Sequence, residues 1–190
     1  MSNLKVKTAR GSMFMASLSL VMRPISMALA IVLLRLLNPA DFGLLALAMI
    51  LFNTANLITD LGLRPAIVQT KHDIRKVAHY AFVLVMLASM AMTGLVILLA
   101  PPIASFLGGG EELIPILRWM AVYITVDGLW IVPEALLRRE LRFKQLGLSQ
   151  IPGELASTLI AIPLALMGFG VWSLVIGNIS GQLLRSALLW

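Results

Sequence analysis

Long apolar stretches separated by short, basic loops constrain the fold more than any other feature of this chain. Six stretches are long enough to cross a bilayer as helices, at about 20 residues each; they lie at about 12–37, 42–68, 79–106, 113–137, 147–168 and 171–190. In lipid the backbone must satisfy its own hydrogen bonds, which leaves helices or a closed barrel, and no stretch alternates as barrel strands do. The sequence therefore predicts an all-α, polytopic transmembrane helical bundle of six spans, forming a single domain at residues 1–190.

Positive charge predicts the orientation of this bundle. Arg35 and Arg118 fall toward one side of the alternating topology, Arg23 lies inside the first span, and Arg185 lies near the end of the last. The rest of the 15 Lys and Arg fall on the opposite side: Lys5, Lys7, Arg10, Arg64, Lys71, Arg75, Lys76, Arg138, Arg139, Arg142 and Lys144. Because loops rich in Lys and Arg stay cytoplasmic, we expect a cytoplasmic N-terminus.

The composition excludes several classes of protein. Charged residues make up 13% of the chain and hydrophobic residues 59%, whereas about 25% of a soluble domain is charged. The net charge of +6 comes from short loops, so we expect it to meet anionic lipids and not nucleic acid. Cysteine is absent, His72 and His79 lack metal-ligand spacing, and residues 108–110 (GGG) lack the Lys-Ser/Thr of a phosphate-binding loop. We therefore expect no metal, no cofactor and no enzymatic activity.

Arg23 is the first candidate for a functional side chain. It lies near the middle of the first span and precedes Pro24, which can bend a helix. A charge at this depth is costly and normally faces a bundle interior or a wet cavity. We predict that Arg23 binds an anionic headgroup, and a structural pair with a helix acid such as Glu154 is the alternative. Small and polar residues share its face at helical spacing: Ser12, Ala16, Ser19, Ser26 and Ala30.

The fourth span carries an aromatic and acidic stripe at helical spacing: Trp119, Tyr123, Asp127, Trp130 and Glu134. Aromatic faces beside carboxylates suit sugar stacking and hydrogen bonding to hydroxyls. Tyr123, Asp127 and Trp130 are therefore predicted to bind substrate, and Asp127 is also a candidate for ion coupling. The ends of the stripe have simpler explanations. Trp119 can be an interfacial anchor, and Glu134 precedes Arg138 by four residues, the favoured orientation for a local pair.

The second and fifth spans add further polar candidates. Asn53 and Asn56 share a face and are candidates for substrate binding, with hydrogen bonding between helices as the alternative. Asp60 precedes Arg64 by four residues, which predicts a local ion pair. Glu154 in the fifth span is a second candidate for ion coupling.

Other segments predict packing or topology. Small residues in the sixth span, including Gly177 and Gly181, predict close helix packing. The third span is nearly all apolar and is expected to face lipid. The elbow at 138–144 is predicted to be amphipathic and to lie on the inner leaflet, with a plain topology determinant as the alternative. Asp41 is a plausible N-cap for the second span.

Four segments, in order along the whole chain, carry a family resemblance. They are residues 35–48 (RLLNPADFGLLALA), residues 60–63 with 66–69 (DLGL and AIVQ), residues 137–144 (LRRELRFK) and residues 168–175 (GFGVWSLV). In this order they resemble the first hairpin, the end of span two, the elbow and the entry to span six of the polysaccharide transporter family, which comprises O-antigen and exopolysaccharide flippases.

The resemblance implies a fold and an activity. This family belongs to the multidrug/oligosaccharidyl-lipid/polysaccharide exporter superfamily, whose members have two six-helix lobes around a central cavity. The chain is therefore expected to be the N-terminal lobe of a two-lobe exporter, and its stop at Trp190 suggests a truncated sequence or half of a larger transporter. Such flippases move undecaprenyl-pyrophosphate-linked oligosaccharide across the bacterial inner membrane by alternating access. Cationic cavity residues bind the pyrophosphate, and Arg23 is the candidate here.

Two other functions remain open at this point. One is a cation-coupled multidrug exporter of the same superfamily, and the other is a non-transporting membrane scaffold of a polysaccharide assembly complex. The expected partners are lipid-linked oligosaccharide, anionic membrane lipids, and polysaccharide polymerase and export machinery.

Overall fold

The computed structural model consists of α-helices and short connections across the residues that it describes, which are 2–60, 62–69 and 73–190. His72 lies outside these residues. Side chains at 2–12, 14–16, 18, 19, 21, 63 and 66 are also outside the description, so the expected polar face of the first span is not described at Ser12, Ala16 and Ser19. The predicted all-α class is confirmed.

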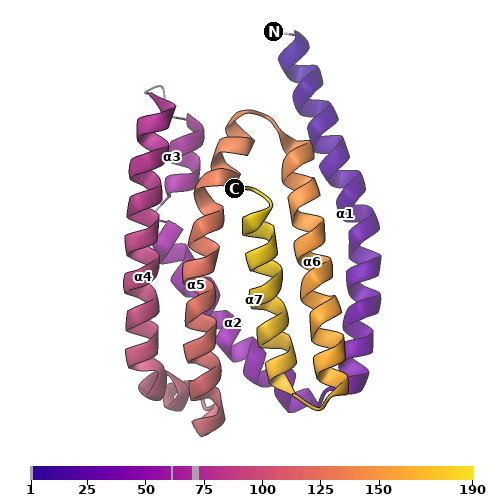
Figure 1. Cartoon of the computed structure of the whole chain (residues 1–190), viewed down its shortest axis with the longest axis vertical. Helices are drawn as coiled ribbons and strands as arrows, with labels where there is room; N and C mark the ends of the chain where they lie inside the picture. The colour runs from indigo at the N-terminus through magenta and orange to yellow at the C-terminus, as the bar shows by residue number, and fades with distance from the viewer. Residues whose placement is uncertain (1, 61, 70–72) are drawn as a thin grey trace.

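Seven helices follow one another along the described chain (Figure 1): α1 (Ser2–Leu36), α2 (Pro39–Asp60), α3 (Leu63–Gln69), α4 (Ile74–Phe106), α5 (Gly110–Arg139), α6 (Phe143–Leu166) and α7 (Val171–Ala187). The N-terminal end of α1, the C-terminal end of the chain, the last turn of α3, the first turn of α4 and the α5–α6 connection lie at one end of the bundle. The turns α1–α2, α4–α5 and α6–α7 lie at the opposite end. The loops that carry most of the positive charge therefore share one end.

The second expected span is divided. Its helix α2 ends at Asp60, and α3 begins at Leu63. Between them Gly62 has φ +68°, a left-handed conformation that glycine adopts without the steric penalty of a side chain. The prediction of one continuous helix at 42–68 was therefore wrong. The break places Arg64 in the first turn of a separate, seven-residue helix.

Three helices are long and apolar enough to cross a membrane by length and composition, within the described residues: α2, α4 and α5. Helix α7 has 17 residues and measures about 26 Å at 1.5 Å per residue, somewhat short of the roughly 30 Å hydrocarbon core. Helix α6 contains Pro152, Pro163 and the charged Glu154. The all-α fold is thus established, and the count of six spans stays a prediction.

Helices α6 and α7 pack with their backbones close together. A Cβ atom added at Gly177 would lie 2.5 Å from the carbonyl oxygen of Ser157, and one added at Gly181 would lie 2.5 Å from the carbonyl oxygen of Gly153. Such distances leave no room for a side chain. The close packing predicted from the small residues of the sixth span is therefore confirmed.

Asp41 joins two turns at the end of the bundle opposite the chain termini. Its Oδ2 accepts a hydrogen bond from the N–H of Asn38, and its Oδ1 accepts one from the N–H of Val171, both at 3.1 Å. Because α2 begins at Pro39, Asp41 lies inside the first turn and does not occupy the N-cap position predicted for it. Its carboxylate instead satisfies the first N–H of α7, where Gly170 offers no capping side chain.

Helix α5 is the central element of the bundle. It packs against α4, α7, α2 and α3, and most of its middle turns are buried. Helix α4 instead exposes large apolar side chains such as Leu87 and Leu98, 60% and 79% exposed, as expected of a face that meets lipid. This arrangement places the polar stripe of α5 inside the protein, against α2, α3 and α7.

Candidate functional site

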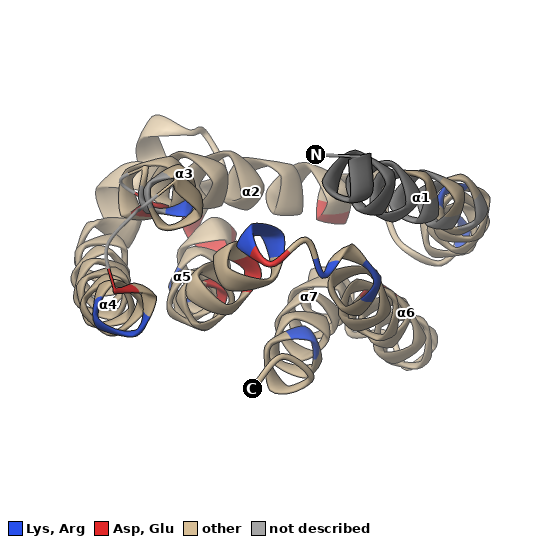
Figure 2. Ribbon diagram, turned by 90° about the horizontal axis from the view of Figure 1, so that it is seen from above, with Lys and Arg blue, Asp and Glu red and all other residues tan. Residues whose placement is uncertain are grey.

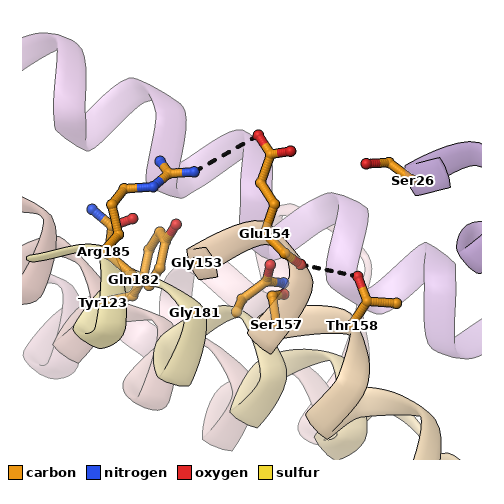
Figure 3. A pocket seen from close by; sticks show the side chains of 10 residues that line it. Ser26, Tyr123, Gly153, Glu154, Ser157, Thr158, Gly181, Gln182 and Arg185 are labelled. Carbon is orange, nitrogen blue, oxygen red and sulfur yellow. Dashed lines mark hydrogen bonds and ion pairs between the residues drawn. The ribbon is translucent and has the colours of Figure 1, made fainter. Parts of the chain in front are cut away.

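A polar pocket of about 190 Å³ lies between α1, α5, α6 and α7. Eight polar side chains line it: Ser26, Tyr123, Glu154, Ser157, Thr158, Asn178, Gln182 and Arg185. Figure 3 shows Ser26 on the α1 side and the Arg185 guanidinium directed toward Glu154. Tyr123 lies about 20 Å from the start of α5 and Arg185 about 21 Å from the start of α7, at 1.5 Å per residue. Tyr123 thus lies near the middle of α5, whereas Arg185 lies two residues before the end of α7, and the pocket is open on the side of Glu154, whose side chain is 48% exposed.

Asp127 and Gln182 form one wall of the site. Asp127 is 9% exposed and Gln182 3% exposed. The Nε2 of Gln182 donates a 2.6 Å hydrogen bond to Oδ1 of Asp127, which joins α7 to α5. Hydrogen bonds to an ionised carboxylate are short and strong, so this contact fixes the orientation of the Gln182 amide. The carbonyl oxygen of that amide is left to accept another hydrogen bond.

Arg185 is held mainly by an aromatic ring. Its guanidinium carbon lies 5.2 Å from the centroid of the buried Trp130 ring, within cation–π range. Its Nη2 lies 3.9 Å from Oε1 of Glu154, too far for a hydrogen bond. Its Nε is buried and has no hydrogen-bond partner among the described residues. Gly153 makes room for this side chain, because an added Cβ would come within 3.0 Å of the Arg185 Cβ.

A second charged network lies at the end of the bundle that contains the chain termini, where Figure 2 shows acidic segments of α5 near basic segments of α3 and of the elbow. Arg64 Nη1 lies 3.0 Å from Oε2 of Glu134, and its other nitrogens lie 3.5 Å from Asp60 and 4.0 Å from Asp127. Glu134 Oε1 accepts hydrogen bonds from Nε and Nη2 of Arg138 at 3.0 and 2.8 Å. The Arg64–Glu134 contact is an ion pair without hydrogen-bond alignment. Asp127 links this network to the pocket.

The local ion pairs expected from the sequence are present, and the structure adds one contact between helices that was not expected. Asp60 and Arg64 pair as predicted, and so do Glu134 and Arg138. Arg64 also reaches across to α5, which the sequence spacing did not indicate. No group of three or more His, Cys, Asp or Glu that could hold a metal occurs within the described residues.

Four of the predicted site residues come together. Tyr123 and Glu154 line the pocket, Asp127 holds Gln182 at its wall, and Trp130 lies behind Arg185. The Tyr123 ring also packs on Phe52 of α2, with centroids 4.4 Å apart. Two of the four residues thus line the pocket, and the other two contact lining residues from behind, although three lie on α5 and one lies on α6.

The other predicted residues lie outside the pocket. Arg23 is exposed on α1, three residues before Ser26, and Glu154 pairs with Arg185 in place of the alternative Arg23 pair. Asn53 is exposed on α2, and Asn56 is half-buried with an Oδ1 that has no hydrogen-bond partner among the described residues. Trp119 is 54% exposed and contacts Trp172 edge to face, away from the pocket.

Sequence reasoning missed the contribution of α7 to the pocket. Asn178, Gln182 and Arg185 are spaced by four and three residues, so they share one helical face that lines the pocket. This spacing is visible in the sequence, but the span was interpreted only as a packing surface because of its small residues. The reach of Arg64 across to α5 had no comparable signal, because it depends on the break between α2 and α3.

Comparison with known proteins identifies relatives. A family model described as polysaccharide biosynthesis protein matches residues 32–190. The chain is 31% identical over 157 residues to the succinoglycan biosynthesis transport protein ExoT of Rhizobium meliloti (strain 1021), covering 83% of this chain and 31% of ExoT. It is 23% identical over 190 residues to the lipopolysaccharide biosynthesis protein WzxC of Escherichia coli (strain K12), covering 98% of this chain and 37% of WzxC. No solved structure matches.

These matches establish the family of this chain, and they cover only part of the length of each relative. The chain spans about a third of the length of the two curated relatives. ExoT is a transport protein, in agreement with the expectation that this chain is not an enzyme. The family model covers most of the chain, and all four segments that carried the resemblance lie within the matched region. The chain belongs to the polysaccharide biosynthesis protein family.

Proposed function

We propose that this chain is the N-terminal lobe of a flippase that moves undecaprenyl-pyrophosphate-linked oligosaccharide across the bacterial inner membrane by alternating access. The transport role of ExoT and the biosynthetic role of WzxC support this proposal. The observation that carries it is the polar pocket between α1, α5, α6 and α7 in a largely apolar bundle. Unsatisfied polar groups at membrane depth are costly, so such a pocket must hold water or a ligand.

The proposed roles follow from position. Arg23 binds the pyrophosphate, because it is an exposed cation within α1 and lies one turn from Ser26, which lines the pocket. Tyr123 and Trp130 belong to the glycan path, and Asn53 and Asn56 extend it along α2. Ion coupling is assigned to the acids of the site. Asp127 is buried beside Gln182 and near Arg64, and Glu154 is the second candidate.

The proposed topology counts α2 and α3 together as one of six spans, with the chain termini in the cytoplasm. The distribution of positive charge supports this orientation. At the same end of the bundle Arg75, Lys76, Arg142 and Lys144 are exposed and are assigned to contacts with anionic lipid headgroups. Partnership with polysaccharide polymerase and export machinery stays a prediction.

The test is transport of a fluorescent lipid-linked oligosaccharide by the full-length protein in proteoliposomes. Arg23→Ala is expected to abolish transport while the protein still inserts, because the pyrophosphate loses its cation. Arg35→Ala is the matched control, since Arg35 is an exposed arginine on the same helix about 18 Å away at 1.5 Å per residue. Unchanged transport by Arg23→Ala would contradict the assignment. Export of small amphipathic cations in place of the glycan would favour the drug-exporter alternative.

A further inference from the structure

We propose that the pocket between α1, α5, α6 and α7 is a binding subsite for a single neutral sugar ring. The subsite would hold one hydroxyl-rich ring of the transported glycan, so its biological role rests on the proposed function. The preference of the pocket for a neutral sugar does not rest on the proposed function, because it follows from the side chains that line the pocket.

The pocket contains hydrogen-bonding groups that the protein does not use. Tyr123, Ser157 and Asn178 all line it, and within the described residues none of their side chains has a hydrogen-bond partner. The amide nitrogen of Gln182 is taken by Asp127, which leaves its carbonyl oxygen as an acceptor. The Nε of Arg185 is a buried donor without an acceptor. A buried polar group without a partner costs about 1–3 kcal/mol, so a ligand that accepts a hydrogen bond from the Arg185 Nε removes that cost. Tyr123, Ser157 and Asn178 are half-buried and offer further hydrogen bonds to the same ligand.

The charges at the pocket select against ions. Arg185 and Glu154 face each other at 3.9 Å, so the pair is close to neutral as a unit. A metal cation bound at Glu154 would be repelled by the guanidinium, and an anion bound at Arg185 would be repelled by the carboxylate. Hydroxyl groups avoid both penalties, because a hydroxyl donates to the carboxylate and accepts from the guanidinium. A ligand with many hydroxyls and no charge therefore matches this pair.

The shape of the pocket limits the size of the ligand. Gly153 and Gly181 lie in its lining, where the absence of side chains exposes the backbone of the closely packed helices. The volume of the pocket is about 190 Å³. This space accommodates one sugar ring, and because the Glu154 side chain at its edge is 48% exposed, the rest of the glycan would continue out of the pocket on that side.

The test is binding of methyl glycosides of glucose, galactose and N-acetylglucosamine to the purified full-length protein, measured by saturation-transfer NMR. Asn178→Leu removes an amide from the pocket with little change in volume, and Arg185→Met removes the guanidinium but keeps an apolar stem. Gln145→Leu is the matched control, because it removes an exposed amide at the start of α6 outside this pocket. We expect at least one glycoside to bind and both pocket variants to bind it about tenfold more weakly, the effect of losing one or two hydrogen bonds. The control should bind it as the unmodified protein does.

Other results would overturn the subsite. Equal glycoside binding by the unmodified protein and both pocket variants would place the sugar elsewhere. Binding of inorganic pyrophosphate in place of the glycosides, lost in Arg185→Met, would make the pocket an anion site. The subsite and the proposed function can fail separately. If the protein binds a glycoside in a way that depends on Asn178 but does not transport lipid-linked glycan, the subsite stands and the flippase assignment is wrong. Thermal unfolding of each variant identifies those that fail to fold, and Glu154→Gln then provides a third, independent change in the pocket.

Discussion

Glu134→Gln tests whether the charged network between α3, α5 and the elbow holds the fold together. The Glu134 side chain is 4% exposed and is the shared partner of Arg64 and Arg138. Glutamine keeps the size and one carbonyl oxygen but removes the charge. Two arginines would then face each other across a neutral amide, without the carboxylate that now compensates both.

The expected cost follows from distance and exposure. Coulomb's law gives about 5–6 kcal/mol for unit charges at the 3.0 Å Arg64–Glu134 separation, with an effective dielectric constant of about 20. The arginine side chains are 36% and 48% exposed, so water screens them and reduces this value. Removing one partner of a fully buried pair costs about 3–5 kcal/mol, and an exposed pair contributes about 0.2–1 kcal/mol. We therefore expect Glu134→Gln to lower the free energy of unfolding by about 2–4 kcal/mol.

The assay is SDS-induced unfolding of the protein in mixed micelles, followed by tryptophan fluorescence, in a double-mutant cycle with Arg64→Met. Because removal of both groups leaves fewer uncompensated charges, the double variant should lose about 1–2 kcal/mol less than the sum of the single losses. Glu140→Gln is the control, since the Glu140–Arg142 pair is exposed and should contribute less than about 1 kcal/mol. Additive losses within about 0.5 kcal/mol would refute the coupling across the break between α2 and α3.

Three further changes test the packing around the site. Gly177→Leu should separate α6 from α7 and cost at least about 1–3 kcal/mol, the usual penalty of overpacking, which the same unfolding assay measures. Asp41→Ala leaves the Val171 N–H without its acceptor and should cost about 1 kcal/mol; an unchanged free energy of unfolding would mean that the tie between α2 and α7 contributes nothing. Gly153→Ala would place a Cβ 2.8 Å from the carbonyl oxygen of Gly181 and 3.0 Å from the Arg185 Cβ, so it should both weaken glycoside binding and lower the free energy of unfolding by about 1–3 kcal/mol; an unchanged free energy of unfolding would show that α6 and α7 have room to separate.

Much of the fold followed from the sequence because lipid leaves a chain few choices. A membrane span without alternating strands must be helical, and α4, α5, α6 and α7 begin and end within about five residues of the stretches predicted for them. Helix α1 ends where it was predicted to end but begins at Ser2, about ten residues before the predicted stretch. The break at Gly62 was missed, because the apolar character continues on both sides of it. Hydropathy identifies residues that tolerate lipid, but it does not report the backbone conformation at a single glycine.

The candidate site was predictable only in part. Helical spacing correctly placed Tyr123, Asp127 and Trp130 on one inward face of α5, since residues three and four apart share a face. Spacing could not show which helix faces them. The partner of Asp127 is Gln182, 55 positions later in the chain, and that pairing depends on how α5 and α7 meet.

The sequence by itself determined the class of the protein: an all-helical membrane chain, with its positive charge concentrated in the loops at one end and a family signature spread along its length. These properties are local, because they depend on composition and on spacing within single helices. The tertiary structure alone decided the pairing of charges between different helices. Glu154 meets Arg185, Arg64 reaches Glu134, and the glycines of α6 and α7 bring polar faces together around one pocket. Contacts between helices depend on their packing and relative rotation, which no single segment of the sequence specifies.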